Sequence, residues 1–125
     1  MAEQMFRRMI FNVLAKNCDD HTKNFSFRLK QNQEWELAPA YDICYAYDPK
    51  SIWVSQHALS INGKRKNFSN SDFLSIAKSM NIKKAEQIIL QVQEVVSQWK
   101  SYASEVEVHP SLSKKISNHL PVLLK

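Results

Sequence analysis

Residues 17–24 hold the side chains with the most potential for chemistry, in the order Asn-Cys-Asp-Asp-His-Thr-Lys-Asn. Two carboxylates, an imidazole, an ammonium and two amides fall within eight residues. Asp19 precedes Asn24 by five residues, and Asp42 follows further along the chain. Carboxylate and amide oxygens are hard ligands, of the kind that binds Mg²⁺ together with water and substrate phosphates. On composition alone, a solvated polar turn is the competing interpretation.

The segments after this cluster favour the metal-site interpretation. Residues 25–30 and 34–38 alternate between apolar and polar side chains on either side of a three-residue loop, which predicts a β-hairpin. Only one register places the large apolar side chains on one face. That register pairs Leu29 with Trp35 and Phe27 with Leu37. Continued to its open end, the hairpin brings Asn24 to within two residues of Asp42.

The order of these residues matches a known arrangement for phosphoryl transfer. The catalytic loop of protein kinases supplies an Asp that accepts the substrate hydroxyl's proton and, five residues later, an Asn that holds a metal. A later Asp completes that metal site. Asp19, Asn24 and Asp42 have the same order, and the first two have the same interval. The sequence therefore predicts that Asn24 and Asp42 share one divalent ion beside Asp19.

Helical periodicity accounts for most of the remaining chain. Ser69 and Asp72 have the spacing of a capping box at the start of a helix. Weak strands are predicted at 52–55 and 57–61. Helices are predicted at 3–16, from 70 onward, at 83–105 and at 111–124, the last interrupted by Pro121. The predicted fold class is α+β, mainly helical, with the hairpin bearing the candidate catalytic loop.

Length and composition set further limits. A chain of 125 residues, 44% hydrophobic, suits one domain. No apolar run of about 18 residues and no signal-like opening is present, so we expect no membrane span and a cytoplasmic location. Cys18 and Cys44 form no paired framework and are predicted to be buried thiols. Lys plus Arg (17) exceed Asp plus Glu (12), and this net charge of +5 favours anionic partners.

The single glycine, Gly63, restricts nucleotide chemistry within this chain. Loops that cradle phosphates need several glycines so that backbone N–H groups can approach the anion. Neither a G-x-G-x-x-G nor a Walker loop occurs. We therefore expect any ATP-gripping loop to come from outside this chain.

Three segments resemble the carboxyl-terminal part of HipA-type toxins, which are bacterial serine/threonine kinases of toxin-antitoxin systems. They read Asn17-Cys-Asp-Asp-His-Thr-Lys-Asn-Phe-Ser-Phe27, Leu37-Ala-Pro-Ala-Tyr-Asp-Ile43 and Leu59-Ser-Ile-Asn-Gly-Lys-Arg65. The recognisable motifs fall within residues 8–66, and the helical remainder suits the helical lobe of that family. The resemblance implies ATP-dependent phosphorylation of a Ser or Thr in a protein substrate.

The resemblance also implies roles for single residues. Asp19 would be the catalytic base, and Asn24 and Asp42 would hold Mg²⁺. His21 and Lys23 match the loop motif and are assigned to binding the cofactor ATP. The competing interpretation is that His21 braces the loop by hydrogen bonding and that Lys23 only steadies phosphate or a neighbouring carboxylate.

The family resemblance also predicts how this chain relates to a whole kinase. Residues 1–125 would be a kinase-like C-lobe fragment without the amino-terminal portion that grips ATP, and alone it would bind ATP poorly. The implied partners are that missing portion, a protein substrate and a HipB-like DNA-binding antitoxin, so any contact with DNA would be indirect. Apolar surface left by the missing lobe predicts self-association.

Two other functions compete with the kinase interpretation. A metal-dependent hydrolase would gather its ligands from Asp19, Asp20, His21, Asp42 and His57. A non-catalytic partner- or nucleic-acid-binding module of a toxin-antitoxin system would use basic clusters on the surface. Those clusters are Arg7-Arg8, Lys64-Arg65-Lys66, Lys83-Lys84 and Lys114-Lys115. Solvated helix faces explain the same clusters. The aromatic residues Tyr41, Tyr45, Tyr47 and Trp53 have two interpretations, a protein-docking surface and the commoner role in the core.

Overall fold

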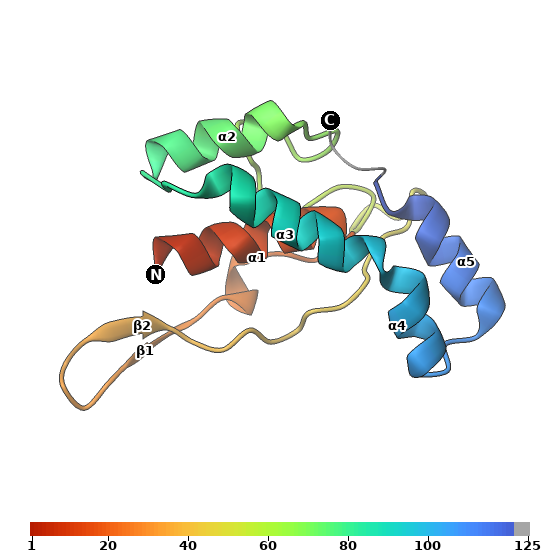
Figure 1. Cartoon of the computed structure of the whole chain (residues 1–125), viewed down its shortest axis with the longest axis horizontal. Coiled ribbons are helices and arrows are strands. Elements are labelled where there is room, and N and C mark those ends of the chain that lie inside the picture. Colours follow the sequence, from red (N-terminus) through yellow and green to blue (C-terminus); the bar gives the residue numbers. More distant parts are fainter. Residues whose placement is uncertain (122–125) are drawn as a thin grey trace.

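The computed structural model describes residues 1–121, which contain five α-helices, one short 3-10 helix and one antiparallel hairpin (Figure 1). Their bounds are α1 Ala2–Leu14, η1 Thr22–Asn24, β1 Phe27–Leu29, β2 Trp35–Leu37, α2 Asn70–Ser79, α3 Ala85–Ser97, α4 Trp99–Glu105 and α5 Pro110–His119. The chain is thus mainly helical with one two-stranded hairpin, as the periodicity predicts. No helix in residues 1–121 combines the length and hydropathy needed to cross a membrane.

The hydrophobic core lies between α1, α2 and α3. α1 packs along α3, and α2 lies beside them, whereas α4 and α5 occupy one end of the molecule (Figure 1). The apolar stripe of α1 buries Phe6 and Ile10 against Phe73 of α2 and Ile88 of α3. Full burial of such side chains contributes about 1.5 to 3 kcal/mol each. This core fixes the end of α1, from which the chemically active loop emerges.

The predicted hairpin register is confirmed, with Leu29 opposite Trp35 and Phe27 opposite Leu37. The two strands project from the helical body (Figure 1). Phe27, Leu29 and Trp35 are each more than half exposed. Alternation therefore predicts which side chains share a face, but no element in residues 1–121 covers that face.

Two predicted strands and one predicted long helix are wrong. The segment 52–55 is a set of turns, and in 57–61 only Ile61 forms an isolated bridge, to Lys64. The segment predicted as one helix over 83–105 forms two helices, α3 and α4. The backbone turns at Gln98, whose N–H donates to the Val95 carbonyl and whose carbonyl accepts the Ser101 N–H, each three residues away. This turn lets the Trp99 indole N–H donate to the carbonyl oxygen of Ser113, at 3.0 Å. Of the helix predicted at 111–124, residues 122–124 lie outside the described residues.

The predicted capping box at the start of α2 is confirmed. The Asp72 carboxylate is buried and accepts hydrogen bonds from Asn62 Nδ2 (2.9 Å), the Ser69 backbone N–H (2.8 Å) and Lys64 Nζ (2.9 Å). These hydrogen bonds, that of Asn62 first, hold the pKa of Asp72 far below its ordinary value. Asp72 thus links α2 to the loop around Gly63, in the segment that resembles the HipA family.

The stability lost when the Asp72 carboxylate is replaced should depend on pH. Asp72→Asn is expected to lower the free energy of unfolding by about 2 to 3 kcal/mol near pH 7, because four donors, including the Ser69 hydroxyl, lose a charged acceptor. Because the pKa of Asp72 is lower in the folded than in the unfolded protein, its carboxylate stabilises the fold at pH values above the ordinary pKa of Asp. This stabilisation is lost as the pH falls toward the pKa of Asp72 in the folded protein. The deficit of the variant should therefore shrink below about pH 4.

Urea unfolding at a series of pH values measures this effect. Asp48→Asn, at an exposed aspartate, is the control and should shift stability by no more than about 0.5 kcal/mol. A deficit for Asp72→Asn that stays constant down to pH 2 would contradict the assigned cause.

Candidate functional site

The loop that carries Asp19 begins at an unusual helix end. After α1, Lys16 adopts a left-handed conformation with φ of 55°. The Asn17 N–H then donates to the Asn12 carbonyl (2.9 Å) and the Lys16 N–H to the Val13 carbonyl (3.3 Å). This is the Schellman pattern, which usually places glycine where Lys16 stands. It turns the chain sharply and begins the loop at a fixed position beside the core.

Two distant segments hold the loop from either side. The Cys18 N–H donates to the Ala46 carbonyl at 3.0 Å, and the Ala58 N–H donates to the Cys18 carbonyl at 3.1 Å. Cys18 is buried as predicted, and burial raises the pKa of its thiol to about 11. Cys18 is therefore a structural, unreactive thiol directly before Asp19.

Asp20 and His57, which the hydrolase interpretation places around a metal ion, form a buried hydrogen-bonded pair instead. Asp20 Oδ2 lies 3.0 Å from His57 Nδ1, and Asp20 Oδ1 accepts the backbone N–H groups of Ala58 (2.8 Å) and Leu59 (3.4 Å). Both side chains are almost fully buried. The two residues are 37 positions apart, so no spacing rule signals the pair. Asp20 therefore anchors the loop in the protein interior.

Asp19 faces solvent, with 52% of its side chain exposed. Its backbone carbonyl accepts a hydrogen bond from Asn24 Nδ2 at 3.0 Å, which closes the turn between the two residues. Nε2 of His21 lies 3.7 Å from Oδ1 of Asp19. The turn thus holds one exposed carboxylate next to an imidazole, with the side-chain oxygen of Asn24 left without a hydrogen bond from residues 1–121.

Asp42 is tethered to the same turn. The hydroxyl of Tyr41, its neighbour, donates to the Lys23 carbonyl at 2.8 Å. Asp42 itself is exposed, has a φ of 54°, and makes no hydrogen bond or ion pair with the described residues. Partial burial, then Asp42, then Asp19 raise the pKa of the Cys44 thiol. Both carboxylates therefore lie within electrostatic reach of one thiol, and Cys44 is exposed rather than buried as predicted.

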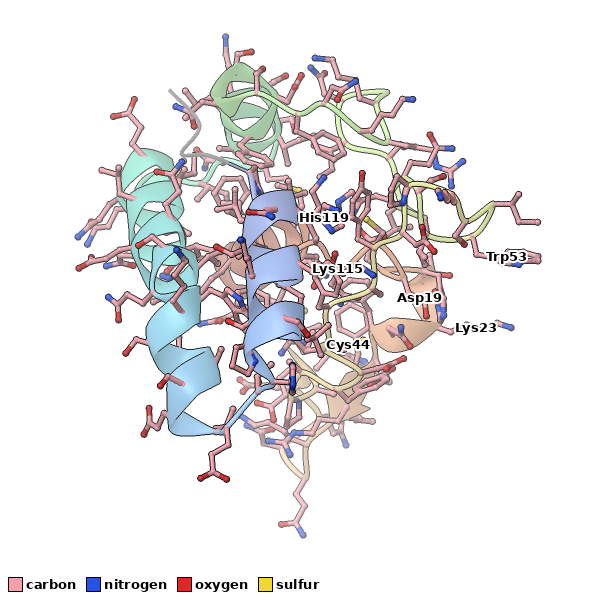
Figure 2. All side chains as sticks on the ribbon, turned by 90° about the vertical axis from the view of Figure 1, so that its right-hand side faces the viewer. Asp19, Lys23, Cys44, Trp53, Lys115 and His119 are labelled. Carbon is pink, nitrogen blue, oxygen red and sulfur yellow. The ribbon has the colours of Figure 1, made fainter. Side chains whose placement is uncertain are left out.

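The two residues assigned to the cofactor lie at the rim. Lys23 is exposed, and its side chain extends away from the body of the protein, on the side of the molecule where Asp19 lies (Figure 2). His21 Nδ1 is buried without a hydrogen-bond partner among the described residues, whereas Nε2 faces Asp19. His21 is thus next to the candidate base and Lys23 is free to reach an anion.

The donor set suits magnesium better than a transition metal. Asn24 is half-buried and Asp42 is exposed, and the hydrogen bond from Tyr41 to Lys23 joins the two segments that carry them. Their amide and carboxylate oxygens are ligands of the kind that Mg²⁺ binds together with water and phosphate oxygens. The ligand set of the hydrolase alternative is divided, because Asp20 and His57 are buried together while Asp19 faces solvent. Across residues 1–121, no three His, Cys, Asp or Glu side chains are grouped to hold a metal ion.

The structure defines a mainly helical domain with a protruding hairpin, and hydrogen bonds tie the turn of Asp19 and Asn24 to the segment of Asp42. The family model of the HipA-like C-terminal domain matches residues 1–99, and the chain belongs to this family. HipA-like C-terminal domains are parts of HipA-family kinases. Residues 100–121, with α5 and most of α4, lie beyond the match. No curated protein and no solved structure matches the chain.

Proposed function

We propose that this chain is the catalytic-loop half, a kinase-like C-lobe, of a HipA-like serine/threonine-protein kinase. The observation that carries the proposal is the closed turn from Asp19 to Asn24, in which the Asn24 amide bonds the Asp19 carbonyl and the Asp19 carboxylate faces solvent. A general base needs this combination of fixed position and access to the substrate hydroxyl. Family membership supplies the reaction class.

In the proposed mechanism, the Asp19 carboxylate orients the Ser or Thr hydroxyl of a protein substrate and accepts its proton as the oxygen attacks the γ-phosphorus of ATP. The bond from that phosphorus to the β–γ bridging oxygen breaks, and ADP leaves. Asn24 and Asp42 would hold Mg²⁺, which neutralises charge on the phosphates. Lys23 reaches toward those phosphates. His21 lies beside Asp19 and restricts its orientation. The buried Asp20 keeps the loop in place.

The ATP-gripping elements belong, in this proposal, to further polypeptide outside the 125 residues. The chain has one glycine, so it lacks a phosphate-cradling loop. The exposed apolar face of the hairpin, formed by Phe27, Leu29 and Trp35, offers that polypeptide a surface to cover. Without it, we expect weak ATP binding, little turnover and self-association through this face.

The non-catalytic alternative has less support. Several of the basic side chains that a nucleic-acid surface would need are used within the chain. Arg8 donates to the Ala38 carbonyl, Lys64 pairs with Asp72, and Arg65 donates to the His57 carbonyl. The proposal also includes a HipB-like DNA-binding antitoxin as partner, because the chain belongs to the HipA-like family. Contact with DNA would then be indirect.

Paramagnetic mapping with Mn²⁺ and ATP tests the metal assignment on this chain directly. Mn²⁺ accepts the same oxygen ligands as Mg²⁺, and it broadens NMR signals of nearby groups. We expect selective broadening of the Asn24 side-chain amide and the Asp42 amide. Asp42→Asn should raise the Mn²⁺ concentration that gives the same broadening at both signals by at least about tenfold. Asp48→Asn, at another exposed aspartate, should change nothing.

Two results would contradict this assignment. Broadening centred on other carboxylates, or broadening at Asn24 that persists unchanged in Asp42→Asn, would remove the shared metal from the proposal. Magnesium-dependent transfer of labelled phosphate from ATP to a serine or threonine, in a polypeptide that also contains the ATP-gripping portion, tests the reaction itself.

A further inference from the structure

The loop of residues 48–54 presents the two most exposed large apolar side chains in the described part of the chain. Ile52 is 86% exposed and Trp53 is 79% exposed. They are adjacent in sequence and lie between the site residue Asp42 and the anchor residue His57. Figure 2 shows Trp53 extending from the protein on the side that also carries Asp19 and Lys23. Paired exposure of this size marks interaction surfaces.

This loop is ordered by its own polar groups rather than by burial of its apolar ones. Oδ1 of Asp48 accepts the Lys50 N–H at 2.9 Å. Oγ of Ser51 accepts the N–H groups of Trp53 (3.0 Å) and Val54 (3.3 Å). The Asp48 N–H donates to the Val54 carbonyl at 3.2 Å and closes the loop. Two large apolar side chains are thus held in solvent by a preformed backbone, which lowers the entropy lost when a partner binds.

Both ends of the loop are anchored next to the candidate base. Before the loop, Ala46 bonds the backbone of Cys18. After it, His57 and Ala58 bond Asp20. Cys18 and Asp20 are the two neighbours of Asp19 in the chain. The two ends of the loop are therefore tied to the chain directly on either side of Asp19.

We propose that Ile52 and Trp53 form a docking tip for the protein substrate of the Asp19 site, and that they contact apolar side chains flanking the acceptor Ser or Thr. The inference rests on the proposed kinase function. The anchoring on both sides of Asp19 favours the substrate as occupant, since this geometry relates the tip to the reacting hydroxyl. The tip then contributes substrate selection, and Asp19 contributes chemistry.

The test uses the chain labelled with 5-fluorotryptophan and synthetic peptides with a central Ser. Trp35, Trp53 and Trp99 give three ¹⁹F signals, and Trp53→Phe assigns the relevant one. Peptides with Leu, Ile or Phe near the Ser should shift the Trp53 signal, and peptides with Glu or Ser there should not. Signals of Trp35 on the hairpin and Trp99 on α4 serve as internal controls and should stay in place.

Variants distinguish specific peptide binding at the tip from nonspecific binding to exposed apolar side chains. Ile52→Ser should weaken peptide binding about tenfold, as expected for a contact of an interface centre. Ser51→Ala removes the hydroxyl that fixes the loop and should weaken binding while Ile52 and Trp53 remain. Leu90→Ser, at an apolar side chain of α3 that is 64% exposed, is the matched control and should bind as the parent does.

Other occupants of the tip give results that would overturn the proposal. A Trp53 signal that shifts when the ATP-gripping portion is joined to the chain, and that peptides then no longer move, indicates that this portion covers the tip. A Trp53 signal that moves with protein concentration alone indicates a second copy of the chain. One that moves with phosphatidylglycerol vesicles but not with peptides indicates a lipid surface. A signal that no peptide moves removes the docking tip altogether.

Phosphate transfer to the same peptides, measured separately in the polypeptide with the ATP-gripping portion, distinguishes the two proposals. Transfer without any preference for apolar flanking residues would leave the kinase function standing and overturn the docking tip. Apolar peptides that move the Trp53 signal without ever becoming phosphorylated would overturn the kinase function instead.

Discussion

Asp19→Asn is expected to lower the rate of magnesium-dependent phosphate transfer by a factor of about 100 to 10,000, the range for loss of a general base. The amide cannot accept the hydroxyl proton, but it has nearly the size of the carboxylate. Asp19 is half exposed, and its carbonyl, which holds Asn24, is unchanged in the variant. The free energy of unfolding should therefore change by no more than about 0.5 kcal/mol.

The measurement is labelled-phosphate transfer from ATP to a protein or peptide, in the polypeptide that joins this chain to an ATP-gripping portion. Urea unfolding of the same samples shows whether the fold is intact. Glu94→Gln is the control, because it removes an exposed carboxylate from α3, outside the Asp19 loop and the loop of residues 48–54. In cells, growth inhibition by that polypeptide should disappear with Asp19→Asn. Toxicity or transfer that survives would mean that Asp19 is not the base.

The sequence predicts the parts of this site that follow from local pattern. Alternation over two short segments fixes the hairpin register, because a slip of one residue would move Leu29 and Trp35 to opposite faces. The capping box at Ser69 is likewise a local signal. The interval from Asp19 to Asn24 corresponds to a real contact between the Asn24 amide and the Asp19 carbonyl. Local patterns thus predict the turn, though not the roles of its side chains.

The remaining features depend on contacts between distant segments. Asp20 and Asp19 are chemically identical in the sequence, and only the approach of His57 makes one an anchor and leaves the other exposed. No Gly or Pro signals the break between α3 and α4 at Gln98. The break accompanies a tertiary contact, in which the Trp99 indole N–H donates to a carbonyl oxygen of α5. The apolar residues at 52–53 look like a strand, but hydroxyl and carboxylate caps hold them in turns. Pattern rules do not include such tertiary contacts.

Asp20→Ala is expected to lower the free energy of unfolding by about 3 to 5 kcal/mol, because three donors in the protein interior lose a carboxylate acceptor. The change leaves His57 and the N–H groups of Ala58 and Leu59 without their acceptor in the interior. Urea unfolding near pH 7 measures the loss. Asp20→Asn keeps one oxygen acceptor and should cost about 1 to 3 kcal/mol, so it remains measurable if the alanine variant does not fold.

Asp19→Ala is the matched control, since it deletes the adjacent carboxylate from the exposed side of the same loop. It should leave stability within about 0.5 kcal/mol. A double-mutant cycle with His57→Ala then isolates the pair, and we expect a coupling free energy of at least about 1 kcal/mol between positions 20 and 57. Asp20→Ala should exceed His57→Ala in its effect, because the carboxylate also holds the backbone of Ala58. Equal effects of Asp19→Ala and Asp20→Ala, or no coupling to His57, would show that this pair does not anchor the loop.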